Sequence, residues 1–161
     1  MIKSVCFTGH RNITETDRLK KALVLQLEKL ISQGAENFYA GGALGWDMLC
    51  EKTVIELRKR FPAIKLHLIL PCPAAEQTAN WREKDKAEFN RLLSAADTVQ
   101  VCSAHYFDGC MKVRNMRLVS LSEVCVCYYS GMWRSGTGQT VRIAEQQGLT
   151  VINIAENQGA M

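Results

Sequence analysis

The sequence predicts an α/β domain built on a doubly wound, largely parallel sheet with helices on both faces. Two observations carry this prediction. Short apolar runs alternate with stretches of helical periodicity along the chain, as in right-handed strand–helix–strand units. In addition, three glycine-bearing turns stand where an apolar run gives way to a helical pattern: residues 8–11 (TGHR), 41–47 (GGALGWD) and 135–140 (SGTGQT).

The apolar periodicity fixes the expected elements in order. Leucines recur at helical spacing after the first strand until Gly34 stops them, and Pro62 follows the second helix. The most apolar strand directly precedes the last glycine turn. The expected strands are 2–8, 38–40, 64–70, 98–102, 124–129 and 149–154, and the expected helices are 19–31, 44–60, 89–97, 111–121 and a last one from the 135–140 turn to about 148.

Length and composition predict one globular domain over residues 1–161. The chain is 47% hydrophobic and 22% charged, which is ordinary for a domain with a sizeable core. Its N-terminus enters a strand pattern at once, and no segment approaches the roughly 18 apolar residues of a membrane helix. We therefore expect a cytoplasmic protein without a membrane partner.

Seven cysteines are an odd number, and four of them lie in apolar strand-like runs: Cys6, Cys102, Cys125 and Cys127. Buried, reduced thiols are expected rather than disulfides. Cys125 and Cys127 share one face of a strand, but no second Cys/His pair has the spacing of zinc ligands. We expect neither a metal site nor a resident cofactor.

The glycine turns are the candidate anion sites. Glycine lets a ligand approach the backbone, and the N–H groups of a helix N-terminus bind phosphate. In the first turn, Arg11 is suited to grip a phosphate with two hydrogen bonds. His10 there can either contact the ligand or make a structural hydrogen bond. The last turn offers Gly136 and Gly138 with hydroxyl groups beside them, but it lacks the lysine of a P-loop.

The second turn leaves two alternatives open at each of two residues. Asp47 falls in the first turn of the following helix, where it can cap the helix or accept ribose hydroxyls. Trp46 can stack on a base or pack between sheet and helix.

The 111–121 helix carries several cations, of which Arg114 and Arg117 share a face. Arg114 and Asn115 are candidate ligand contacts, whereas Arg117 has no assigned role. The preceding loop with His105, Tyr106 and Asp108 is either a lid or a solvent-exposed connection. All candidate ligand contacts are Thr8, Gly9, His10, Arg11, Gly41, Gly42, Gly45, Trp46, Asp47, Arg114, Asn115, Ser135, Gly136, Thr137, Gly138 and Thr140.

The order of these motifs, together with Pro71, Gln77 and Trp81, resembles the YpsA-like group of the SLOG superfamily, over residues 6–154. This superfamily unites the Rossmann-like domain of the DNA-processing protein DprA with the LOG-type nucleotide phosphoribohydrolases. The resemblance implies a Rossmann-like fold and a nucleotide-like ligand. LOG hydrolases place a catalytic glutamate at the position that Thr140 occupies here, and the carboxylates available as substitutes are Asp47 and Glu145.

Three functions follow from these observations. The first is binding of a nucleotide or a nucleotide-derived phosphorylated molecule, as a sensor acting through a protein partner or as a homo-oligomer. The second is a LOG-like hydrolase of nucleoside monophosphates, which the threonine disfavours. The third is DprA-like binding of single-stranded DNA, which the net charge of +4, the dispersed basic residues and 7% aromatics support poorly. In the first case, the phosphate is expected between the first, second and last glycine turns.

Overall fold

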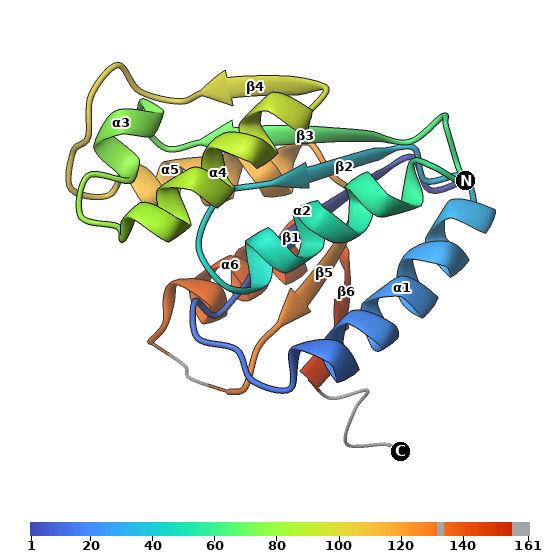
Figure 1. Ribbon diagram of the computed structural model, residues 1–161. Coiled ribbons are helices and arrows are strands. Elements are labelled where there is room, and N and C mark those ends of the chain that lie inside the picture. Colours follow the sequence, from blue (N-terminus) through green and yellow to red (C-terminus); the bar gives the residue numbers. More distant parts are fainter. Residues whose placement is uncertain (132–133, 156–161) are drawn as a thin grey trace.

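The computed structural model describes residues 1–131 and 134–155, and they form a six-stranded, all-parallel sheet (Figure 1). The strand order is β4-β3-β2-β1-β5-β6. The predicted fold class is confirmed. The strands are β1 (Ser4–Gly9), β2 (Asn37–Ala40), β3 (Lys65–Leu70), β4 (Thr98–Val101), β5 (Val124–Tyr128) and β6 (Thr150–Asn153), and the helices are α1 (Thr16–Ser32), α2 (Trp46–Leu57), α3 (Ala74–Gln77), α4 (Glu83–Ala95), α5 (Cys110–Ser120) and α6 (Gly136–Gln146).

Several boundaries and one element differ from the sequence prediction. Helix α2 begins at Trp46, two residues later than expected, because Gly45 has a φ of 79° that no helix adopts. Helix α4 begins at Glu83, well before its apolar periodicity starts, because its first turn is polar and acidic. The short helix α3 was not predicted, since four residues are too few to show a period.

The helices cover both faces of the sheet (Figure 1). On one face, α1, α2 and α4 bury side chains such as Leu23, Val54 and Phe89 in one core, whereas α5 and α6 bury a second core on the other face. Strand β5 divides its side chains between the two: Val124 and Val126 belong to the first core, and the expected same-face pair of Cys125 and Cys127 belongs to the second.

All seven cysteines lie among the described residues as thiols outside any disulfide, and six of them are buried. The prediction of reduced thiols is confirmed. Burial was wrongly predicted for Cys102, which is exposed because it follows the edge strand β4, where no further strand covers it.

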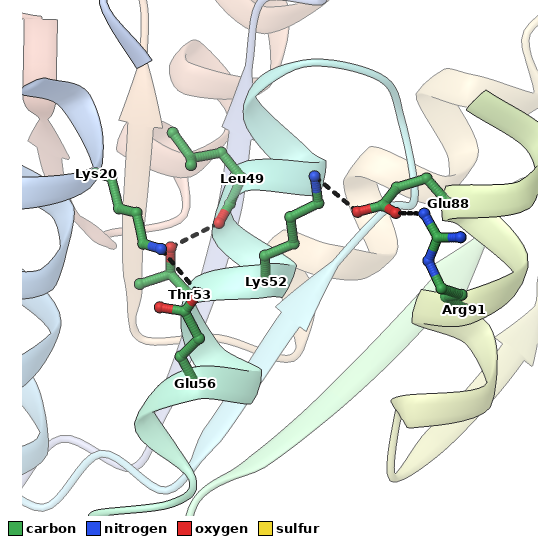
Figure 2. A network of polar contacts seen from close by, with 7 residues as sticks. All are labelled: Lys20, Leu49, Lys52, Thr53, Glu56, Glu88 and Arg91. Atoms are coloured by element: carbon green, nitrogen blue, oxygen red, sulfur yellow. Dashed lines mark hydrogen bonds and ion pairs between the residues drawn. The ribbon is translucent and has the colours of Figure 1, made fainter. Parts of the chain in front are cut away.

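Polar contacts on the outer side of α2 tie this helix to both of its neighbours (Figure 2). Lys20 of α1 lies 2.8 Å from Glu56, and Lys52 lies 2.7 Å from Glu88 of α4, which also contacts Arg91. Exposed pairs of this kind add only about 0–1 kcal/mol each to stability.

The side of the sheet on which successive strands are added changes at β1. From β1 the chain adds β2, β3 and β4 on one side, and it then returns to place β5 and β6 on the other. Strands β1 and β5 end level, with Thr8 opposite Cys127 and Gly9 opposite Tyr128. The turns that follow β1, β2 and β5 therefore meet at one edge, at the switch point where open α/β sheets hold ligands.

Within the described residues, no helix is both long and apolar enough to span a lipid bilayer.

Candidate functional site

A cavity of about 350 Å³ opens at this switch point. It collects residues from the end of β1 and the turn after it, from the second glycine turn and the first turn of α2, from one side of α5, and from the N-terminal turn of α6. Its lining consists of Phe7, Thr8, Gly9, His10, Arg11, Ala43, Asp47, Met111, Arg114, Asn115, Ser135, Gly136 and Thr137.

The cavity brings together candidates from all three glycine turns and from α5. Those that line it are Thr8, Gly9, His10, Arg11, Asp47, Arg114, Asn115, Ser135, Gly136 and Thr137. Those outside its lining are Gly41, Gly42, Gly45, Trp46, Gly138 and Thr140. Sequence reasoning missed Phe7, Ala43 and Met111; of these, Met111 stands one helical turn before Arg114, which is a signal that the spacing offered.

Arg114 is the central cation of the site. Its side chain is only 5% exposed, and it reaches from α5 across the sheet edge to donate a hydrogen bond from Nη1 to the carbonyl of Gly41. Its Nε donates to Oδ1 of Asn115 at 2.8 Å. Burial lowers the pKa of Arg114, and the nearby carboxylate of Asp47 opposes this shift. A guanidinium nevertheless remains charged at any physiological pH.

Asp47 faces Arg114 from the first turn of α2. Its Oδ2 accepts a hydrogen bond from the backbone N–H of Ala43 at 3.2 Å, and its side chain is 5% exposed. Burial raises the pKa of Asp47, whereas Arg114 and the backbone N–H groups of Ala43 and Gly41 lower it. Asp47 thus braces the second turn and also presents a carboxyl group to the cavity.

Glu51 lies one helical turn behind Asp47 and is fully buried. Its Oε2 accepts from the backbone N–H of Gly42 at 3.2 Å, while Oε1 has no hydrogen-bond partner among the described residues. Burial and the neighbouring Asp47 raise the pKa of Glu51 well above its ordinary value, so the structure favours its neutral form. The sequence signal for Glu51 is its i+4 spacing from Asp47, which puts both on one face of α2.

The N-terminus of α6 forms another wall of the cavity. Ser135 caps this helix, since its hydroxyl accepts from the N–H of Gly138 at 3.0 Å. Among the described residues, nothing lies within 4 Å of a Cβ placed on Gly136. Thr140 lies behind this turn, where its buried hydroxyl donates to the carbonyl of Gly136 at 2.9 Å. The backbone of this turn is therefore open at Gly136, whereas the N–H of Gly138 is already used by the cap.

Other glycines of the turns serve packing within the protein. A Cβ on Gly41 would come within 2.4 Å of the Arg114 guanidinium, and one on Gly9 within 2.3 Å of the indole of Trp46. Gly45, at positive φ, would meet the carbonyl of Arg11 at 2.0 Å. Glycine is needed at these positions because other residues of the protein pack directly against the backbone there.

The structure favours the packing interpretation of Trp46. The ring is fully buried, and its centroid lies 5.7 Å from that of Tyr128. It supports the floor of the site beneath Gly9 and offers no face to a ligand.

His10 and Arg11 differ in how they are held. The Nε2 atom of His10 accepts a hydrogen bond from the backbone N–H of Ser130 at 3.1 Å, and burial lowers the pKa of His10. His10 is therefore neutral at physiological pH, with its proton on Nδ1. Arg11 is exposed and lines the same cavity as the buried Arg114.

The remaining candidates lie elsewhere. Arg117 is exposed and outside the cavity lining. Glu145 lines a separate hollow with Cys127 and Asn153. Among the residues that the structure describes, no three His, Cys, Asp or Glu side chains are grouped so as to hold a metal ion.

The fold and the cavity define an α/β protein with a Rossmann-like arrangement and a polar hollow at the topological switch point. Residues 6–151 match the model of the YpsA family, described as the YspA SLOG family. The chain belongs to this SLOG family, as its motifs predicted.

Its relatives include UPF0398 proteins of several bacteria. A UPF0398 protein of Halalkalibacterium halodurans is 31% identical over 123 residues, which are 75% of this chain and 62% of that protein. One of Staphylococcus epidermidis is 32% identical over 106 residues (60% and 55%), and one of Brevibacillus brevis is 24% identical over 142 residues (88% and 63%). The chain thus spans about six-tenths of the length of these curated relatives.

The buried carboxyl of Glu51 predicts a specific pH dependence of stability. Because its pKa is higher in the folded than in the unfolded protein, the folded state holds an extra proton above the ordinary pKa of 4.5. Stability should therefore fall as the pH rises from about 4.5 through the folded pKa, by up to about 1.4 kcal/mol per pH unit. Glu51→Gln should remove this component in urea unfolding between pH 5 and 8.

The control is Glu56→Gln on the same helix, whose carboxylate is half-exposed and paired with Lys20. This variant should keep the wild-type slope. Parallel stability curves for the wild type and Glu51→Gln would show that Glu51 is ionised in the folded protein at neutral pH.

Proposed function

We propose that the cavity binds the phosphate of a nucleotide or of a nucleotide-derived small molecule, and that the protein acts as a sensor or regulator in the cytoplasm. The observation that carries the proposal is the meeting of Arg11, Arg114 and the open N-terminal turn of α6 around one cavity. Helix N-termini and guanidinium groups are two common ways in which proteins bind phosphate.

The charge balance of the cavity supports an anionic ligand. Two arginines face one carboxyl group, Asp47, whose pKa burial raises toward the neutral form. The side chain of Arg114 is already desolvated by the fold, so a ligand phosphate gains its attraction without a further large desolvation of that cation. The described polar lining also includes the hydroxyl side chains of Thr8 and Thr137, which suit phosphate or ribose oxygens.

A second candidate function, hydrolysis of a nucleoside monophosphate, is favoured by Asp47 alone. It is the one carboxyl group among the described residues that line the cavity, and a buried carboxyl with a raised pKa is suited to proton transfer. Thr140 and Glu145 do not line the cavity, so neither supplies a second acid or base there. Binding therefore remains the first proposal.

Binding is tested by calorimetry with a panel of the four common nucleoside 5′-monophosphates. Arg11→Ala should weaken binding by about 10- to 100-fold, because a hydrogen bond to a charged group contributes roughly 1.5–3 kcal/mol. The exposed Arg11 supports no core contact, so the unfolding temperature should stay unchanged. Arg18→Ala, on an exposed arginine outside the cavity, is the matched control. Equal affinities for Arg11→Ala and the wild type would exclude Arg11 from the site.

A pair of glycine substitutions separates the ligand approach from packing. Gly136→Ala should weaken binding while leaving stability within about 0.5 kcal/mol, since its Cβ meets open space in the protein. Gly41→Ala should instead lower the unfolding temperature, because its Cβ would collide with the Arg114 guanidinium. Undiminished affinity in Gly136→Ala would contradict an approach of the ligand at α6.

Turnover is tested by chromatography of free base after incubation with the same nucleotides. We expect negligible release, because one carboxyl group has to serve without the second acid or base that such a step uses, a loss of roughly 10²–10⁴-fold. Release at many turnovers per minute that Asp47→Asn abolishes would make hydrolysis the function of this cavity.

A further inference from the structure

A second hollow of about 520 Å³ adjoins the candidate phosphate cavity. The two hollows share Arg11 and Met111 in their linings, so they open onto one another at these side chains. The other residues of the second hollow come from the turn before α2, from α3 and the segment after it, from the first turn of α4, and from the connection between β4 and α5: Leu44, Glu76, Gln77, Asn80, Trp81, Arg82, Asp85 and Tyr106.

The two hollows differ in charge. In the second, Arg82 is paired with Asp85 at 3.3 Å, and Glu76 lies 3.6 Å from Nδ1 of His105. The first cavity has an excess of positive charge from Arg11 and Arg114. In the second hollow, Arg11 is the cation that it shares with the first, and Arg82 is paired with an acid. A ligand that filled both would place its anionic end in the first cavity and an uncharged part in the second.

Aromatic side chains border the second hollow. The ring of Trp81 packs almost perpendicular to that of Phe89, with 5.3 Å between the centroids. Tyr106 is 57% exposed, yet its backbone is fixed, because its N–H donates to Oε1 of Glu76 at 3.0 Å. The connection from β4 to α5 accordingly passes beside α3 (Figure 1). The hydrogen bond from the backbone of Tyr106 to Glu76 thus keeps the exposed ring of Tyr106 beside the hollow.

Gln77 couples this hollow to the phosphate cavity. Its Nε2 donates to the carbonyls of Gly41, at 3.5 Å, and Gly42, at 3.3 Å, so it ties α3 to the second glycine turn. The same carbonyl of Gly41 accepts the hydrogen bond of Arg114. Gln77 is a positioning residue that keeps the two hollows in a fixed relation.

From this geometry we infer that the second hollow is the subsite for the planar base of the nucleotide whose phosphate occupies the first. The inference rests on the proposed function and narrows its ligand class to nucleoside 5′-phosphates, as opposed to sugar phosphates or free phosphate. The base lies against the rings of Trp81 and Tyr106, and the ribose passes Arg11. Both volumes are of the size of small-molecule sites, roughly 300–1,000 Å³.

The test compares the four nucleoside 5′-monophosphates with ribose 5-phosphate and inorganic phosphate by calorimetry on the wild-type chain. At least one nucleotide should bind about tenfold more tightly than ribose 5-phosphate, the ratio that a single base–aromatic stack supplies. In Tyr106→Ala this ratio should fall towards one, while the affinity for ribose 5-phosphate stays the same. Trp81→Leu should act in the same direction.

Phe107→Ala is the matched control, because Phe107 is a neighbouring, 45% exposed aromatic residue outside the hollow. It should keep the wild-type ratio. Equal binding of ribose 5-phosphate and every nucleotide would overturn the base subsite and leave the phosphate site intact. Wild-type ratios in both Tyr106→Ala and Trp81→Leu would likewise overturn it. Failure of all the phosphorylated probes to bind would overturn both the subsite and the proposed function.

Discussion

The site depends on the buried guanidinium of Arg114. A desolvated cation is costly unless hydrogen bonds and opposite charge compensate it, and here the carbonyl of Gly41, Oδ1 of Asn115 and the nearby Asp47 do so. Arg114 comes from α5 on one face of the sheet, whereas Gly41 and Asp47 come from the turn and helix linked to the other face. The side chain of Arg114 therefore links the helix layers on the two faces of the sheet at its carboxyl edge.

This constraint explains the glycine at position 41, where the guanidinium occupies the space of a Cβ. Gly42 has a different reason, because its φ is 72° and a Cβ there would come within 2.9 Å of the ring of Phe89. The turn is therefore a surface for packing within the chain, and Asp47 in the first turn of α2 offers its carboxyl group to Arg114. The last turn is different, since Gly136 faces open space. The glycines of the two turns thus differ in their surroundings, with tight packing at Gly41 and open space among the described residues at Gly136.

The sequence predicted the fold class, the order of the elements and the edge at which the turns meet, because strand–helix alternation and parallel strands constrain all three. It also named both arginines of the cavity. It could not tell the glycines that serve packing from those that leave the backbone open, since the partner of Gly41 is Arg114, 73 residues further along the chain. It also missed Glu51, because a glutamate within a helix is ordinarily solvated and only tertiary packing buries it. Helix α3, and with it the second hollow, left no periodic signal.

The proposed function requires that the turn after β1, the start of α5 and the start of α6 form one phosphate-binding cavity. The most direct test is a two-dimensional amide NMR titration of the ¹⁵N-labelled chain with each of the four common nucleoside 5′-monophosphates. The largest chemical-shift changes are expected at the amides of Gly9, His10, Asn115, Gly136 and Thr137, all of which line the cavity. Changes centred on the hollow of Glu145 and Asn153, or no changes with any of the four nucleotides at millimolar concentration, would contradict a phosphate site in this cavity.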